Sequence, residues 1–143
     1  MRRLILASLL ILPLAAHAQT TIEVSSAWAR ATTPHAQSGG IFLTLTDHGT
    51  ADRLVSVSTP VAETAELHET IDDHGIMRMR GAPGLALPPN GTVTLKPGGL
   101  HIMLFGLKRA LARGERFPVD LVFEHAPSVR VMVVVGGAGD SGP

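Results

Sequence analysis

Residues 65–80 read AELHETIDDHGIMRMR, and this stretch predicts a β-hairpin. The letters DDHG at 72–75 contain Asp and Gly, which favour tight turns. The runs on either side, Thr64–Ile71 and Ile76–Arg80, are short and rich in residues typical of strands. The same stretch holds two histidines and two methionines. A hairpin built from it can therefore place imidazole and thioether groups side by side, and both are metal ligands.

The rest of the chain repeats this pattern of short strands and turns. Gly, Pro, Asn or Asp separate the runs that are rich in Val, Ile, Leu and Thr, as in PPNG (88–91) and KPGG (96–99). No segment has a sustained helical period, although LKRALARGER (107–116) fits one helical turn. The spacing of the strands predicts a single all-β domain, an antiparallel sandwich or a small barrel. The predicted strands are Ile22–Arg30, Gly40–Thr46, Arg53–Ser58, Thr64–Ile71, Ile76–Arg80, Thr92–Leu95, His101–Phe105, Phe117–Glu124 and Val129–Val135.

The first residues, MRRLILASLLILPLAAHAQT, have the pattern of a secretory signal peptide. Arg2 and Arg3 form a basic start, and the apolar run at 4–14 is too short to span a bilayer. The letters AHA at 16–18 form a cleavage signal. We therefore expect Sec-type export to the periplasm, with cleavage after Ala18.

Cleavage there would leave a β domain at residues 19–136 and a short tail at 137–143, GAGDSGP, which we expect to be flexible. Loss of Arg2 and Arg3 reduces the 12 basic residues to ten, against 12 acidic residues, so the net charge becomes −2. This balance argues against binding to nucleic acid or to an anionic membrane. No second apolar stretch is long enough for insertion into a membrane.

The chain contains no cysteine. An exported domain of this size must then be stabilised by packing alone, without disulfides. The absence also excludes thiol nucleophiles, thiol–disulfide chemistry, cysteine-ligated zinc and blue-copper centres.

Four residues form a candidate metal site. Alternate residues of a strand share a face, so His101 and Met103 lie on one side of their strand, about 6.6–7 Å apart at Cα. His68 and Met79 lie on the two strands of the predicted hairpin. Thioether sulfur is soft and neutral and favours Cu(I), while imidazole suits copper in both oxidation states. A neutral set of two His and two Met leaves the ion's charge uncancelled, so we expect this site near the surface.

Each of these residues also has a plain structural interpretation, since Met often fills a core and His often forms a surface hydrogen bond. The other histidines and methionines fit such roles. Met77 faces the same way as Met79 but has no assigned role. The remaining assignments are Met132 to the core, His74 to a turn, and His35, His48 and His125 to loops.

The spacing His68-x10-Met79-x21-His101-x-Met103 resembles the signature of the PCuAC family of periplasmic copper chaperones. The words AELHE, GIMRMR and LKPGGLHIMLFGLK around these positions are also similar to the family. The resemblance extends over the mature domain and is most specific in residues 65–108.

This resemblance implies a cupredoxin-like, Ig-like Greek-key β fold and a binding protein, not an enzyme. It implies a Cu(I) site formed by His68, Met79, His101 and Met103. It also implies delivery of copper to the dinuclear copper centre in subunit II of cytochrome c oxidase, together with Sco-type copper proteins. Some family members bind Cu(II) through a tail rich in His and Met, but the tail of this chain has neither residue.

Three alternatives stay open from the sequence. A histidine-brace copper protein would need His17 at the processed N-terminus, which requires cleavage after Ala16. A metal-free structural or interaction sandwich would place the four candidate ligands on different faces. A hydrolase could be imagined from Ser38 and the cluster at 72–74, but the chain lacks a G-x-S-x-G elbow.

Overall fold

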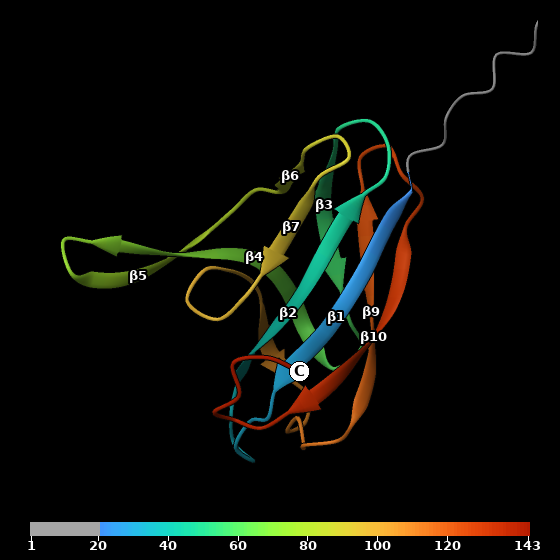
Figure 1. The fold of residues 1–143 in the computed structure, drawn as a ribbon. Helices are drawn as coiled ribbons and strands as arrows, with labels where there is room; N and C mark the ends of the chain where they lie inside the picture. The colour runs from blue at the N-terminus through green and yellow to red at the C-terminus, as the bar shows by residue number, and fades with distance from the viewer. Residues whose placement is uncertain (1–20) are drawn as a thin grey trace, which may run out of the picture.

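The computed structural model describes residues 21–143. Within this range it contains only strands, turns and loops, with no α-helix and no helix that could cross a membrane (Figure 1). The prediction of a single all-β domain is confirmed. The strands are β1 (Ile22–Arg30), β2 (Ser38–Asp47), β3 (Asp52–Ser58), β4 (Ala62–Asp73), β5 (Ile76–Gly81), β6 (Leu85–Leu87), β7 (Thr92–Leu95), β8 (Leu100–Leu107), β9 (Arg116–Phe123) and β10 (Val129–Gly136).

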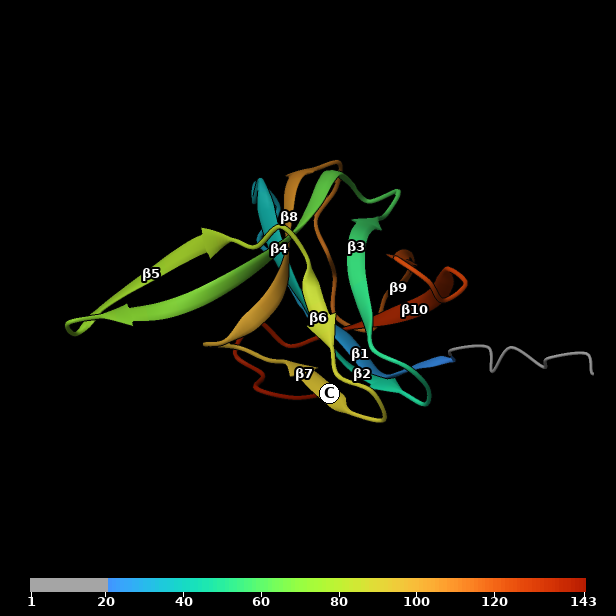
Figure 2. The same ribbon diagram turned by 90° about the horizontal axis from the view of Figure 1, so that it is seen from above.

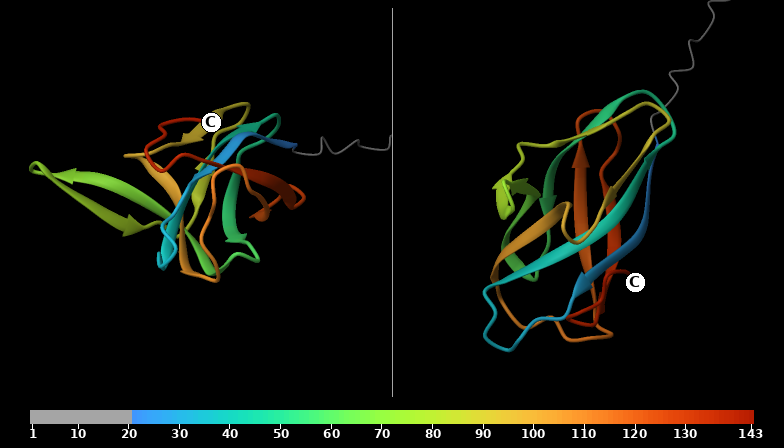
Figure 3. Two further views of the ribbon diagram at one scale, coloured as in Figure 1. Left: turned by 90° about the horizontal axis from the view of Figure 1, so that it is seen from below. Right: turned by 60° about the vertical axis from the view of Figure 1, so that its left-hand side comes forward.

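Seven strands close into a barrel. Their order is β4-β8-β2-β1-β10-β9-β3, and β3 returns to β4 through the pair Val57↔Ala65. β1 and β10 run parallel, and the other neighbours in the barrel are antiparallel. Figure 3 shows the closed arrangement from two further sides. Of the two architectures that the sequence allowed, the barrel is the one observed.

The hairpin of β4 and β5 extends beyond this barrel. We call residues 68–81 the arm, because in this range β4 pairs with β5 from His68↔Gly81 to Asp73↔Ile76. Figures 1 and 2 both show the arm projecting away from the barrel wall. The β4 strand is thus shared: its first half belongs to the barrel and its second half to the arm.

The core fills the inside of the barrel. Strand alternation sends every second side chain inward, so each wall strand contributes fully buried aliphatic residues. Examples are Ile41, Leu43 and Leu45 of β2, Ile102 and Leu104 of β8, and Val119 and Leu121 of β9.

All nine predicted strands are present, with ends that differ by a few residues. The short β6 was missed, because Pro83, Pro88 and Gly84 make its surroundings read as a loop. The suggested helical turn at 107–116 is wrong. There the backbone N–H of Leu111 donates to the hydroxyl oxygen of Thr32 at 2.9 Å, and Thr32 N–H donates to the Leu111 carbonyl at 3.0 Å.

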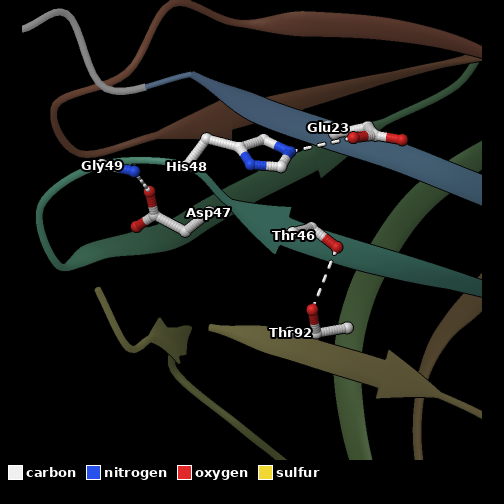
Figure 4. Close-up of polar contacts among 6 residues, drawn as sticks. All are labelled: Glu23, Thr46, Asp47, His48, Gly49 and Thr92. Carbon is white, nitrogen blue, oxygen red and sulfur yellow. Dashed lines mark hydrogen bonds and ion pairs between the residues drawn. The ribbon is translucent and has the colours of Figure 1, made fainter. Parts of the chain in front are cut away.

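The turn after β2 shows how a predicted turn is built (Figure 4). The carboxylate of Asp47 accepts a hydrogen bond from the backbone N–H of Gly49 at 2.7 Å. His48 is exposed and its Nε2 contacts a carboxylate oxygen of Glu23 at 2.9 Å, as Figure 4 also shows. The assignment of His48 to a loop is therefore confirmed, as are those of the exposed loop residues His35 and His125.

The C-terminal tail makes defined contacts with the barrel. Asp140 accepts a hydrogen bond from Gly137 N–H through its carboxylate at 2.6 Å, and its carbonyl accepts one from Arg30 Nε–H at 2.9 Å. The flexibility of residues 137–143 stays a prediction. The expected signal peptide at 1–18 lies outside the described residues.

Asp52 joins β3 to the loop between β9 and β10. Its buried carboxylate accepts hydrogen bonds from the backbone N–H groups of Arg53 (2.7 Å), His125 (3.0 Å) and Ala126 (2.7 Å). Burial alone would raise the pKa of Asp52, but the hydrogen bonds from Arg53, Ala126 and His125 outweigh it. They hold that pKa below its ordinary value of 3.8.

We expect the substitution Leu104→Ala to lower the free energy of unfolding by about 2–5 kcal/mol, because it leaves a cavity in the barrel interior. Val55→Ala removes a side chain from an exposed position of β3, so its effect should stay below about 1 kcal/mol. Urea unfolding of both variants measures the difference. Equal losses would contradict the assignment of Leu104 to the core.

The lowered pKa of Asp52 predicts a pH dependence of stability. The ionised carboxylate stabilises the fold above the unfolded pKa, and this contribution is lost as the pH falls through the folded pKa. Asp52→Asn should therefore cost roughly 1–3 kcal/mol at neutral pH, and the gap from the parent should narrow below about pH 4. Urea unfolding across this range tests it. A gap that is independent of pH would show that the charge of Asp52 contributes nothing.

Candidate metal centre

The core packing of β8 directs His101 and Met103 to the outside of the barrel. Ile102 and Leu104, the alternate residues, are fully buried in the interior. Since neighbours along a strand point to opposite faces, His101 and Met103 share the outer face. This is the side-by-side placement that the sequence predicted for them.

The strand register adds the other two predicted residues to the same face. His68 of β4 lies directly opposite His101 of β8. Met79 of β5 lies opposite Thr70, two residues after His68 on β4. Because cross-strand partners and alternate residues share a face, all four predicted ligands lie on one side of the sheet. The metal-free alternative required different faces and is not supported by this register.

His101 presents an unpaired nitrogen. Only 5% of the residue is exposed, and its Nδ1 lies 2.9 Å from the carbonyl oxygen of Gly99. A carbonyl can only accept, so Nδ1 carries the proton in the neutral ring. The Nε2 atom then has a free lone pair, and it is buried without a hydrogen-bond partner among the described residues. This tautomer is the one that a metal bound at Nε2 needs.

His68 has a second unpaired nitrogen, which is Nδ1, whereas in His101 it is Nε2. Its Nε2 lies 3.3 Å from a carboxylate oxygen of Glu66, and a carboxylate also only accepts. The Nδ1 atom of His68 is left with its lone pair, buried and without a described partner.

The two rings are close enough to share an ion. The ring centroids of His68 and His101 are 6.1 Å apart. Rings that share one ion, with about 2 Å to each nitrogen, have centroids roughly 5–6 Å apart. A buried polar atom without a partner costs about 1–3 kcal/mol, so a ligand that occupies both nitrogens would remove a double penalty.

A pocket of about 310 Å³ opens beside these rings. Met79, His101 and Met103 line it. His68 does not line it, and its ring lies 6.1 Å from that of His101 and 5.5 Å from that of Phe105. Met79 is 62% exposed, in contrast to the buried His101. The donor set therefore runs from a buried imidazole to an exposed thioether on the arm.

In the described part of the chain, nitrogen and oxygen ligands alone do not form a metal site. Within residues 21–143, no group of three or more His, Asp or Glu could hold an ion. The thioethers of Met79 and Met103 are further donors on the face that carries the two histidines. A set of two imidazoles and two thioethers fits Cu(I) better than zinc, calcium or magnesium.

Sequence reasoning missed the aromatic and basic neighbours of the site. Phe42 of β2 lies 6.4 Å from the ring of His101 and 4.7 Å from that of Trp28, measured between centroids. Arg30 of β1 also lines the pocket. These residues are distant in sequence from the signature, and only the sheet order β8-β2-β1 brings them there. Strand alternation alone places Phe105 on the face of His101 and Met103, so this neighbour can be read from the sequence.

The remaining candidates lie elsewhere. Met132 is 49% exposed on β10, so its assignment to the core is wrong: in a run of consecutive apolar residues, the alternation that separates the two faces is hidden. His74 occupies the arm's turn, as predicted, with a φ of 55°. It contacts Asp73 at 2.8 Å, and no described hydrogen bond joins it to Ser38, so the hydrolase alternative gains no support.

Comparisons with known proteins agree with this geometry. Residues 22–135 match the family described as "Putative lipoprotein LpqE-like". The "Putative lipoprotein Lxx21020" of Leifsonia xyli subsp. xyli is 35% identical over 115 residues, which are 80% of this chain and 69% of that protein.

Two solved structures share the fold. The copper-bound PCuAC domain from PmoF2 has a TM-score of 0.71 at 23% identity, covering 85% of this chain and 97% of that domain. The solution structure of CuI-DR1885 from Deinococcus radiodurans has a TM-score of 0.65 at 29% identity, covering 89% of this chain and 84% of that one. The chain thus belongs to the LpqE-like family and has the PCuAC fold. Proteins of the PCuAC type are binding proteins and not enzymes.

Proposed function

We propose that this protein is a periplasmic copper chaperone that binds Cu(I) through His68, Met79, His101 and Met103. One observation carries the proposal: two buried imidazole nitrogens that have no partner among the described residues lie on the same face as two thioether side chains. Imidazole and thioether together favour Cu(I) among the common biological metals.

The structural relatives support the same ion. DR1885 was solved in a form named for Cu(I), and the PCuAC domain from PmoF2 was solved with copper bound. Cu(II) is a possible second form at the imidazoles, which bind copper in both oxidation states.

The geometry suits a protein that holds copper and then releases it. The hydrogen bonds of His68 to Glu66 and of His101 to Gly99 favour the tautomers in which His68 Nδ1 and His101 Nε2 keep a free lone pair for a metal ion. Met79 stands at the exposed end of the donor set and Met103 lies beside the buried ring. An incoming ligand can therefore displace Met79 first, while the histidines still hold the ion.

The copper acceptor that we propose is the dinuclear copper centre in subunit II of cytochrome c oxidase, with Sco-type proteins as further partners. The resemblance to the PCuAC signature supports this choice. Anaerobic mixing of the Cu(I)-loaded protein with the copper-free soluble domain of that subunit would test it. After the two proteins are separated, the copper content of each measures the transfer, and copper that stays entirely on the donor would contradict the proposal.

Export is part of the proposal. The family description as lipoproteins supports a protein outside the cytoplasm. We predict that the protein purified from the periplasm begins at Gln19, because the A-x-A signal at 16–18 precedes it. Mass spectrometry of the intact chain measures this. A chain that begins at His17 would contradict the prediction and favour the histidine-brace alternative.

Met77 and Met79 provide a matched test of the ligand set. Both lie on β5, both face the same side, and they are 61% and 62% exposed, but only Met79 lines the pocket. Met79→Leu should lower the affinity for Cu(I) at least about tenfold, since it removes one thioether. Met77→Leu should leave the affinity unchanged. Competition with a Cu(I) chelator under anaerobic conditions measures both.

Leucine keeps size and apolarity nearly constant, so neither variant should unfold the protein. The variant Met79→Leu/Met77→Leu completes the set. If Met79→Leu alone binds as tightly as the parent and only the double variant is weakened, Met77 replaces Met79 as the ligand. If all three variants bind as tightly as the parent, the proposed site is wrong.

A further inference from the structure

Arg30 stands in the wall of the pocket beside the proposed copper ligands. It is the last residue of β1 and lines the pocket together with Met79, His101 and Met103. Among the described residues that line this pocket, Arg30 alone carries a formal charge. A permanent positive charge beside a proposed Cu(I) site would repel the ion, so a role other than binding copper is expected for Arg30.

The guanidinium of Arg30 is held in place without being neutralised. Its Nε–H donates to the backbone carbonyl of Asp140 at 2.9 Å, and its central carbon lies 5.8 Å from the centre of the Phe42 ring. The carboxylate of Asp140 accepts from Gly137 N–H instead. Within residues 21–143, no carboxylate forms an ion pair with Arg30. Most of its five N–H donors therefore have no acceptor within residues 21–143.

The charges around the proposed site do not balance in the pocket. Two neutral imidazoles and two thioethers do not neutralise the single positive charge of Cu(I), and Arg30 adds a second positive charge. Glu66 contacts His68, but it lines the separate hollows next to Val57 and Ala65 and not this pocket. The pocket is thus electrostatically suited to a ligand that brings negative charge.

We propose that Arg30 receives the anionic donor group of the copper acceptor, a thiolate of a protein partner, as it enters the pocket. This inference rests on the proposed function. In the exchange step the thiolate sulfur forms a bond to Cu(I) and the bond from Cu(I) to the sulfur of Met79 breaks. Copper stays Cu(I), no electron is transferred, and the thiolate carries one negative charge past the guanidinium. Arg30 is a positioning residue and does not bind copper.

Two chelators with the same donor atoms and different charges test this role. Neocuproine is neutral and bathocuproine disulfonate is a dianion, and both remove Cu(I) through a phenanthroline. With the Cu(I)-loaded full-length mature protein, Arg30→Gln should slow removal by the dianion about three- to tenfold and leave removal by neocuproine unchanged. Arg30→Lys should restore most of the rate, and added salt should reduce the difference between parent and Arg30→Gln.

Arg130→Gln is the matched control. It removes the same charge from an exposed arginine that pairs with Asp120 on the β9–β10 side of the barrel, and Arg130 does not line the pocket. It should change neither rate. Thermal unfolding of the copper-free variants measures any loss of stability separately, because Arg30→Gln also removes the hydrogen bond to the Asp140 carbonyl.

The outcomes separate this inference from the proposed function. If Arg30→Gln slows Cu(I) removal equally by both chelators, or by neither, the role of Arg30 is wrong, while copper binding by the protein is unaffected. The role of Arg30 is also wrong if Arg130→Gln slows Cu(I) removal by bathocuproine disulfonate as much as Arg30→Gln does. Failure of the parent protein to hold Cu(I) would instead overturn the proposed function on which the inference rests.

Discussion

The antiparallel register between β4 and β8 is the constraint on which the rest of this structure depends. It sets His68 opposite His101, and at the same time it turns Leu67, Ile102 and Leu104 into the barrel. Because side chains alternate with a period of two, a slip of one residue would exchange the two faces. A slip of β4 by one residue would turn Leu67 out of the barrel and His68 into it, so the hydrophobic core itself fixes the register of the two histidines.

The candidate site lowers the stability of the folded protein, and the barrel core compensates for this loss. Two buried imidazole nitrogens have no hydrogen-bond partner within residues 21–143, and such atoms weaken the folded state when no ligand is bound. This loss falls on the outer face, where Phe42 and Phe105 lie beside the rings, and the interior beneath it is a continuous hydrophobic core. The hydrophobic core and the proposed site therefore lie on opposite faces of the same strands, which is how a small domain without disulfides could carry such a site.

Much of this could be predicted from the sequence because it is local. Strand positions follow from residue type and spacing, and His101 and Met103 share a face through alternation alone. What failed depends on contacts between distant segments: Arg30 reaches the pocket only through the sheet order, and β6 exists only because β3 offers it an edge. Met132 failed for a third reason, since a uniformly apolar strand does not reveal which of its faces is buried.

The arm has two unlike faces, and the difference bears on how copper would leave. One face bears the ion pairs of Arg80 with Glu69 and of Arg78 with Asp73, both at 3.0 Å. These exposed pairs contribute little stability, so the backbone ladder holds the arm's shape. The other face presents Met79 to solvent. Removal of Met79 from the ion would require no change in the barrel core, whereas removal of His101 would disturb a buried ring. Exchange is therefore expected to begin at the arm and to end at the barrel.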